Sequence, residues 1–259
     1  MKRIVVISDL HCGHRAGLTP PEWQWNPKCP EPERRKYAGV QALIWNFYEK
    51  AIFRLKPIYA LVVNGDLVDG KMPKSGGTEL ITADRDEQGQ MAKRCIELAK
   101  PKRLLLTFGT PYHTGVDEDW EKPIARELGA PIKDHLWFEI NGLQFDVRHH
   151  VSRSIIPHGR YTAIAREKLW EQLWANYEER RMSDVLIRSH VHYHVECSDG
   201  QTRMMTTPAL MAYSKYGVRR CTGIVHLGLV YFDVKSKGEY EWGKELLPGR
   251  SLKSKPIQL

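Results

Sequence analysis

Aspartate and histidine residues of the chain gather in five short clusters, most of which directly follow an apolar run. The clusters are Asp9 with His11, Asp66 with Asp69, Thr110 with His113, His149 with His150, and His190 with His192. Carboxylate oxygens and imidazole nitrogens without cysteine suit Zn, Mn, Fe or a similar divalent ion. Two such ions about 3.5–4 Å apart need roughly seven ligands, one of them a shared carboxylate. The ordered series, rather than any single cluster, favours a metal site.

The apolar runs before these clusters predict the strands of a parallel sheet. Residues 2–8, 59–66 and 103–110 are predicted as buried strands, and residues 37–55 and 84–99 as helices. That alternation predicts parallel strands joined by helical crossovers. Ligands of open α/β sheets bind at the carboxyl ends of the strands. The clusters of polar residues stand at those ends.

The rest of the chain adds loops and a second group of strands. Residues 135–150 alternate on both sides of Asn141–Gly142, which is a hairpin signal. The other predicted segments are long loops over 14–35 and 71–82, a helix over 160–182, and strands over 184–196 and 223–234. We therefore expect a single α/β domain over residues 1–259, a β-sandwich of two mixed sheets flanked by helices.

Composition narrows the class of protein. The chain has 259 residues, of which 42% are hydrophobic and 27% charged, as in an ordinary globular protein. No apolar run reaches about 18 residues, so neither a membrane helix nor a membrane partner is expected. The N-terminus lacks the pattern of a signal peptide. The cysteines are odd in number, without a CxxC pair, and predict free thiols in the cytoplasm: Cys12, Cys29, Cys95, Cys197 and Cys221.

The net charge of +8 favours an anionic partner, either a phosphate ester or a nucleic acid. Basic residues occur as pairs and not as a tract, which weakens the case for nucleic acid. The pairs are Arg34–Arg35, Arg180–Arg181 and Arg219–Arg220. Tryptophans in the loop over 14–35 could stack on bases. Trp170 and Trp174 are expected instead to pack their helix.

The series of motifs resembles the calcineurin-like metallophosphoesterases, whose motifs run D-x-H, G-D-x-x-D, G-N-H-D/E, H and G-H-x-H. The stretches 9–11 (DLH) and 65–70 (GDLVDG) match the first two motifs. The stretch 189–192 (SHVH) matches the last, with Ser189 in place of glycine, and His149 fits the isolated histidine. The motifs span most of the chain. The resemblance implies the four-layer fold of that superfamily.

The resemblance also implies a role for each site residue. Asp9, His11 and His192 would hold a first metal ion, His149 and His190 a second, and Asp66 would bridge the two. His113 resembles the histidine that protonates the leaving oxygen or stabilises the phosphoryl charge. Asp69 could orient His113 or simply form a turn. The implied cofactors are two divalent ions, Mn²⁺ first, with Zn²⁺, Fe or Ni²⁺ as alternatives.

The third motif departs from the family, because residues 109–115 read GTPYHTG. Thr110 stands where the family has a metal-binding asparagine, and two further residues precede His113. A threonine hydroxyl or a water could fill the place of the missing ligand. At the fourth motif, His149 is preferred to His150, which should point to the other face of its strand.

Three functions compete at this stage. The leading hypothesis is hydrolysis of a phosphomonoester or phosphodiester by a hydroxide held between two metal ions. The second is a nuclease of the repair type on the same fold, opposed by the lack of an added DNA-binding domain. The third is a non-catalytic metal-binding scaffold, in which the altered GTPYH motif has lost its chemistry. The substrate and the oligomeric state stay open.

Overall fold

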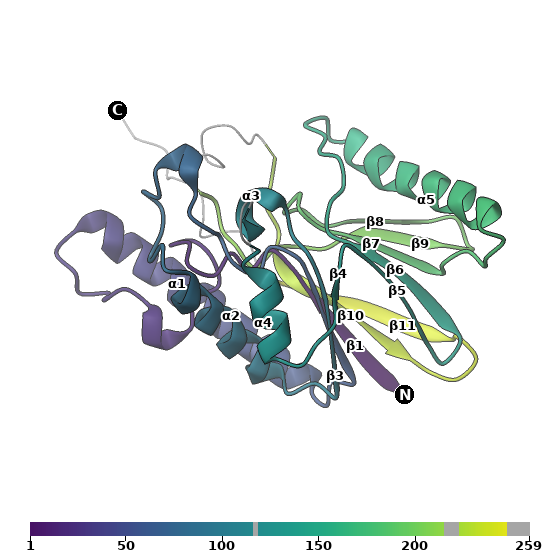
Figure 1. Ribbon diagram of the computed structural model, residues 1–259, viewed down its shortest axis with the longest axis horizontal. Helices are drawn as coiled ribbons and strands as arrows, with labels where there is room; N and C mark the ends of the chain where they lie inside the picture. The colour runs from purple at the N-terminus through teal and green to yellow at the C-terminus, as the bar shows by residue number, and fades with distance from the viewer. Residues whose placement is uncertain (116–118, 215–222, 248–259) are drawn as a thin grey trace.

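The chain folds into two mixed β-sheets that pack face to face, with helices on both outer faces (Figure 1). The structure is a computed structural model that describes residues 1–115, 119–214 and 223–247. Cys221 and the pair Arg219–Arg220 lie outside these ranges. The arrangement confirms the predicted α/β class. Among the described residues, no helix is long and apolar enough to cross a bilayer.

The first sheet contains the three parallel strands that the sequence predicts. Its six strands run in the order β11-β10-β1-β2-β3-β4. They are β1 (Lys2–Ile7), β2 (Ala60–Asn64), β3 (Arg103–Thr107), β4 (Ile132–Lys133), β10 (Leu227–Val234) and β11 (Tyr240–Leu247). Strand β2 is parallel to β1 and β3, whereas β10 is antiparallel to β1. The carboxyl ends of β1, β2 and β3 therefore lie at one edge, near the centre of Figure 1.

The second sheet has five strands in the order β5-β6-β7-β9-β8. They are β5 (His135–Ile140), β6 (Leu143–Arg148), β7 (Val185–Arg188), β8 (Val195–Ser198) and β9 (Arg203–Thr206). The predicted hairpin joins β5 to β6 through Asn141 and Gly142, whose φ angles of 52° and 88° suit a tight turn. Strands β6, β7 and β9 are parallel, so their carboxyl ends also share one edge.

Helices form the two outer layers. The longer ones are α1 (Pro32–Leu55), α2 (Arg85–Ala99), α4 (Glu121–Glu127) and α5 (Gly159–Tyr177). The short turns are η1 (Pro21–Trp23), η2 (Pro73–Ser75) and α3 (Pro111–Thr114). Helices α1, α2 and α4 cover the first sheet, and α5 covers the second (Figure 1). The predicted loop over 14–35 ends early because α1 begins at Pro32, whose fixed φ suits the first turn of a helix.

Side-chain alternation explains why β1 is apolar on both faces. Ile4 and Val6 pack between the two sheets, and Val5 and Ile7 pack beneath the helices of the first sheet. All four are fully buried. Burying a side chain of this size stabilises the fold by roughly 1.5–3 kcal/mol, so a central strand favours a continuous apolar run. Polar residues can therefore stand only beyond the end of the strand, where the motifs begin.

Helix α5 differs from its prediction in length and in packing. It ends at Tyr177, and Trp170 and Trp174 are 54% and 53% exposed, so the prediction that they pack the helix is wrong. The buried face of α5 instead includes Ile164 and two glutamates. Those glutamates, Glu167 and Glu171, pair with arginines: Arg188 at 2.9 Å and Arg180 at 2.7 Å. Ion pairs therefore replace the expected aromatic contact.

The strand predicted over residues 184–196 is also wrong as a single element. Strand β7 ends at Arg188, and a loop over 189–194 leads into β8. His190 and His192 within that loop have φ angles of 70° and 55°, a left-handed conformation that a strand does not allow. The apolar alternation of the segment conceals this break, because the loop residue Val191 is buried as well.

Candidate metal centre

Two loops that follow β1 and β2 run side by side and carry the first four site residues. The amide of Asp9 donates to Gly65 O at 3.1 Å, and the amide of His11 donates to Asp66 O at 3.0 Å. The amide of Asp69 donates back to the first loop at 3.0 Å. This short ladder continues the pairing of the parallel strands beyond the sheet. It holds the two acidic motifs in a fixed register.

Five of the six predicted metal ligands have a left-handed backbone. Their φ angles are 51° at Asp9, 45° at His11, 52° at Asp66, 70° at His190 and 55° at His192. Such conformations are uncommon outside glycine and cost of the order of 1–3 kcal/mol each. Their concentration in three neighbouring loops, after β1, β2 and β7, indicates that this backbone serves a site, since packing alone does not need it.

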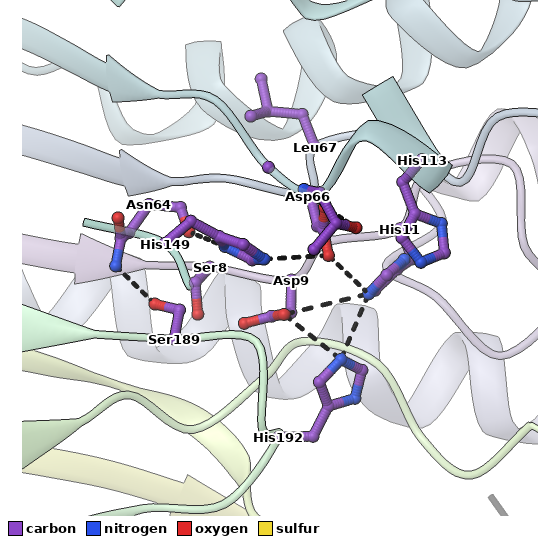
Figure 2. Close-up of polar contacts among 12 residues, drawn as sticks. Ser8, Asp9, His11, Asn64, Asp66, Leu67, His113, His149, Ser189 and His192 are labelled. Carbon is purple, nitrogen blue, oxygen red and sulfur yellow. Dashed lines mark hydrogen bonds and ion pairs between the residues drawn. The ribbon is translucent and has the colours of Figure 1, made fainter. Parts of the chain in front are cut away.

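The first group of candidate ligands joins the loop after β1 to the loop after β7 (Figure 2). His192 Nε2 lies 3.2 Å from Asp9 Oδ1, and His11 Nε2 lies 4.0 Å from the same oxygen. The Nε2 atoms of the two histidines are 3.3 Å apart. One ligand atom from each residue lies within 4.8 Å of the others. The three side chains thus face a common point.

The second group comprises Asp66, His149 and His190, again with ligand atoms within 4.8 Å of one another. His149 Nε2 lies 3.1 Å from Asp66 Oδ2. The same oxygen lies 3.9 Å from His11 Nε2, which belongs to the first group. Asp66 Oδ2 therefore stands between the two groups. The six side chains proposed as ligands from sequence are brought together in one place.

Unpartnered buried atoms test whether these residues fit metal ions. Among the described residues, both Asp9 oxygens, Asp66 Oδ2 and His149 Nε2 are shielded from solvent without a hydrogen-bond partner. Buried carboxylate oxygens without a partner are strongly unfavourable unless a cation compensates them. Oxygens and imidazole nitrogens that converge in this way match the donor set of divalent ions. The site therefore fits divalent metal ions.

The electrostatics of the site favour ionised carboxylates. Burial raises the pKa of Asp9, but His192 and then His149 lower it below its ordinary value. Burial lowers the pKa of His149, but Asp66 outweighs burial and raises it to about 10. The pKa of His190 is lowered to about 4, first by burial and then by His149. In the metal-free protein His190 is thus neutral and His149 protonated at neutral pH, so a metal ion would bind His149 in exchange for its proton.

A hydrogen bond to the backbone fixes the orientation of the His149 ring. Its Nδ1–H donates to Asn64 O at 2.7 Å, which leaves Nε2 as the nitrogen that faces Asp66. Gly65 passes directly beneath this ring with a φ of 76°, and a Cβ there would overlap the imidazole. His150 is exposed and directs its ring toward His190, with 5.0 Å between centroids. The geometry therefore assigns the inward position to His149.

The unusual GTPYH segment forms a helical turn, α3, where a loop was expected. The amide of Thr110 donates to Asp66 Oδ1 at 2.7 Å, and its hydroxyl donates to the same oxygen at 3.2 Å. Thr110 therefore contacts Asp66 and leaves the other carboxylate oxygen, Oδ2, toward the histidines. Pro111 begins the turn, and its fixed φ suits that position.

His113 extends from α3 toward the loop after β2. Its Nδ1 lies 3.1 Å from Asp69 O and 3.3 Å from Asp69 Oδ1. Asp69 Oδ1 also accepts from His11 Nδ1 at 2.9 Å, so this one carboxylate contacts both rings. Burial lowers the pKa of His113, but Asp69 and Asp66 outweigh burial and raise it to about 9. His113 is therefore an imidazolium at neutral pH, beside the candidate metal ligands.

Glu121, at the start of α4, is a site residue that the sequence did not reveal. It is fully buried and accepts from the amide of Leu67 at 2.7 Å and from the amide of Gly109 at 2.8 Å. Gly109 in turn packs so closely on Asp66 that a Cβ there would overlap the carboxylate. Glu121 thus ties together the two loops that bear Asp66 and Thr110. The acidic and polar residues around Glu121 in the sequence did not indicate that its side chain is buried.

A chain of short hydrogen bonds joins the two sheets beside the ligands, and Figure 2 shows its link between Asn64 and Ser189. Asn64 Nδ2 donates to Ser189 Oγ at 2.6 Å, and Ser189 Oγ lies 2.7 Å from Thr207 Oγ1. Thr207 Oγ1 also lies 2.7 Å from Ser8 Oγ. Ser189, which replaces the glycine of the resembled motif, is therefore fully bonded. The network links the ends of strands from both sheets, and sequence spacing alone did not predict it.

The candidate ligands border a cavity of about 420 Å³. His11, Asp66, Asp69 and His113 line one part of it, and His190 and His192 another. Tyr112, Met72 and Met211 add apolar surface. A substrate that enters this cavity can thus meet the ligands and His113 together. Arg148, which flanks His149 in sequence, instead pairs with Glu167 of α5 at 2.7 Å.

No protein-family model matches the chain, and no curated protein matches it by sequence. Solved structures do resemble it. Vps29 of Chaetomium thermophilum is 12% identical, over 95% of this chain and 97% of that one, with a TM-score of 0.47. A conserved protein of Streptococcus pneumoniae TIGR4, described as a predicted phosphoesterase, is 12% identical over 96% and 94%, with a TM-score of 0.43. An archaeal phosphodiesterase is 17% identical over 95% and 99%, with a TM-score of 0.46.

At these identities and TM-scores the likeness concerns the fold alone. The function must therefore be inferred from the residues of the site.

Proposed function

We propose that the protein is a phosphoesterase that uses two divalent metal ions to hydrolyse a phosphate ester. One observation carries this proposal: Asp66 Oδ2 is buried, and it lies between the candidate ligands His11 and His149 at 3.9 and 3.1 Å. A single carboxylate oxygen between two sets of ligands is the arrangement that a shared ligand of two ions requires.

Each of the two groups of candidate ligands would hold one of the two ions. Asp9, His11 and His192 would hold one ion, and His149 and His190 the other, with Asp66 common to both. Bound divalent ions would neutralise the phosphoryl oxygens and lower the pKa of a water to near 7. The preference for Mn²⁺ over Zn²⁺, Fe or Ni²⁺ is part of the proposal, because this donor set suits several of these ions.

The chain itself supplies orientation and a proton. Hydrolysis forms a bond from a water oxygen to phosphorus and breaks the bond to the ester oxygen, which must then gain a proton. His113 holds a proton at neutral pH and borders the cavity, so it can donate to that leaving oxygen. Asp69 fixes the ring from the Nδ1 side, which leaves the other ring nitrogen for the substrate. Thr110 stands at the sequence position of the family's metal-binding asparagine. Its amide donates to Asp66 Oδ1 and so holds that carboxylate in place.

The proposal is tested by an activity screen on the metal-stripped protein reconstituted with Mn²⁺, Zn²⁺, Fe²⁺ or Ni²⁺. The substrates are p-nitrophenyl mono- and diesters, nucleotides, and single- and double-stranded DNA. The Asp66→Asn variant is the matched control, since it keeps the size of the side chain and removes the charge. Hydrolysis by the wild type that a chelator abolishes and the variant lacks would support the proposal. Stoichiometric metal binding without hydrolysis of any substrate would refute it.

A further inference from the structure

A second cavity, of about 190 Å³, adjoins the metal centre on the side of the loop after β7. It shares His190, His192, Met211 and Ser214 with the first cavity, so one wall is common to both. Its other walls come from the segment between β6 and α5, from the first turn of α5 and from the segment before β10. A group held here would lie immediately beside a phosphate at the proposed metal ions.

The second cavity has the charge of an anion site. Arg153 and Arg160 line it, and no aspartate or glutamate occurs among the described residues of its walls. The first cavity, by contrast, is lined by Asp66, Asp69 and Glu79. Arg160 also belongs to the first turn of α5, where the positive end of the helix dipole adds to the potential. The two cavities therefore differ in the sign of the charge that the protein brings to them.

Arg160 is held in place by an aromatic ring, and the described residues give it no ion pair. Its guanidinium carbon lies 4.2 Å from the ring centroid of Tyr193, an arrangement that fixes the plane of the group. Its Nε is shielded from solvent and has no hydrogen-bond partner among the described residues. On the opposite wall, Tyr213 Oη donates to Gly223 O at 3.1 Å and accepts from the amide of Val225 at 2.9 Å. The walls are thus ordered around a donor that lacks an acceptor.

We propose that this cavity, named here the arginine subsite, binds a second phosphate group of the substrate, next to the one that is hydrolysed. The inference rests on the proposed function and specifies its substrate class: a phosphodiester that carries a neighbouring phosphate. The planar guanidinium groups of Arg153 and Arg160 match the geometry of phosphate oxygens. A neighbouring phosphate occurs along a polynucleotide and also at the end of a nucleotide ester. In both kinds of substrate, the group that the arginine subsite recognises is a phosphate.

The test compares substrates that differ by one phosphate. Thymidine 5′-(p-nitrophenyl phosphate) is assayed with and without a 3′-phosphate, and the 3′-(p-nitrophenyl) ester with and without a 5′-phosphate. A short oligothymidylate, whose neighbouring phosphate is a diester, separates a chain from a terminal phosphate. We expect the second phosphate to raise kcat/KM about 10- to 100-fold in at least one pair, the effect of charge-assisted hydrogen bonds.

Substitutions then locate the effect in the arginine subsite. Arg160→Gln should bring the ratio of kcat/KM values close to one, Arg160→Lys should keep part of it, and Arg153→Gln should lower it independently. Lys168→Gln, on the same helix but paired with Asp199 away from the arginine subsite, should leave the ratio unchanged. Circular dichroism checks that each variant folds.

The outcomes separate this inference from the proposed function. If the wild type hydrolyses the simple diesters with metal and a second phosphate does not change kcat/KM, the arginine subsite is refuted and the proposed phosphoesterase activity is supported. The subsite is refuted as well if the preference survives in Arg160→Gln and Arg153→Gln. If the wild type hydrolyses none of the esters with any metal, both inferences fail.

Discussion

Removal of the His113 imidazole should separate proton donation from metal binding. The ring extends from α3, and its side chain is 17% exposed at the edge of the cavity. Within the described part of the site, the ring contacts Asp69, Tyr112 and His11, whose ring centroid lies 4.6 Å away in an edge-to-face arrangement. His113→Ala should therefore leave all six proposed ligands in place, and the metal content of the protein should not change.

The expected loss follows from the protonation state of the ring. Asp69 raises the pKa of His113 to about 9, more than offsetting burial, so the ring carries its proton at neutral pH. A positioned general acid contributes about 10²–10⁴ in rate, which corresponds to about 2.7–5.5 kcal/mol of the activation barrier. For an alkyl ester, whose leaving oxygen needs a proton, kcat should fall by this factor. For a p-nitrophenyl ester the loss should be much smaller, because p-nitrophenolate leaves without protonation.

The pH dependence gives the same assignment an independent check. Because the active form is the imidazolium, kcat for the alkyl ester should fall on an alkaline limb, and His113→Ala should lack this limb. The limb should lie below the pKa of about 9 that the ring has in the metal-free protein, because bound cations disfavour the imidazolium. His158→Ala is the matched control, since that exposed histidine lines neither cavity and should keep its metal and its rate. Equal losses on both esters, or a loss of bound metal in His113→Ala, would refute the role of His113 as an acid.

Three further changes probe the ligands and their support. Asp66→Asn should reduce metal binding and kcat more than any other single ligand change, because Asp66 is assigned to both ions; calorimetric titration with Mn²⁺ and steady-state rates measure this. Glu121→Ala leaves two buried amides without an acceptor, at about 1–3 kcal/mol each, so urea unfolding should show a loss of about 2–6 kcal/mol; a loss below about 1 kcal/mol would contradict it. Asp146→Asn should cost about 3 kcal/mol, because it removes one of the negative charges that compensate the buried Arg188, which lies 2.6 Å from Asp146. Burial raises the pKa of Asp146, but Arg188 outweighs burial, and the pKa is lowered. The loss of stability in Asp146→Asn should therefore be complete above about pH 4 and should shrink as the pH falls below this value.

The sequence predicted the parts of the fold that local periodicity controls. The apolar run of β1 must be covered on both faces, and the same holds for β2 and β3. The sequence therefore predicted these strands, their order along the chain and the polar residues at their ends. The hairpin at Asn141 and Gly142 was equally clear, because two consecutive residues of that type suit positive φ angles. These elements position Asp9 and Asp66.

The errors arise where contacts from distant segments override local pattern. The run over 184–196 alternates like one strand, yet the site needs His190 and His192 on a left-handed loop. The apolar spacing of α5 pointed to Trp170 and Trp174, whereas the buried charge of Arg188 selects Glu167 for the inner face. Glu121 was missed for a related reason: its partners are backbone amides, which carry no signature in sequence.

The most direct test of the binuclear site is anomalous diffraction from crystals of the protein grown with Mn²⁺. Two peaks about 3.5–4 Å apart are expected, one beside Asp9 and His192 and the other beside His149 and His190, with Asp66 Oδ2 next to both. A single peak, or peaks that Asp66 does not contact, would contradict the assignment of two metal ions to this site.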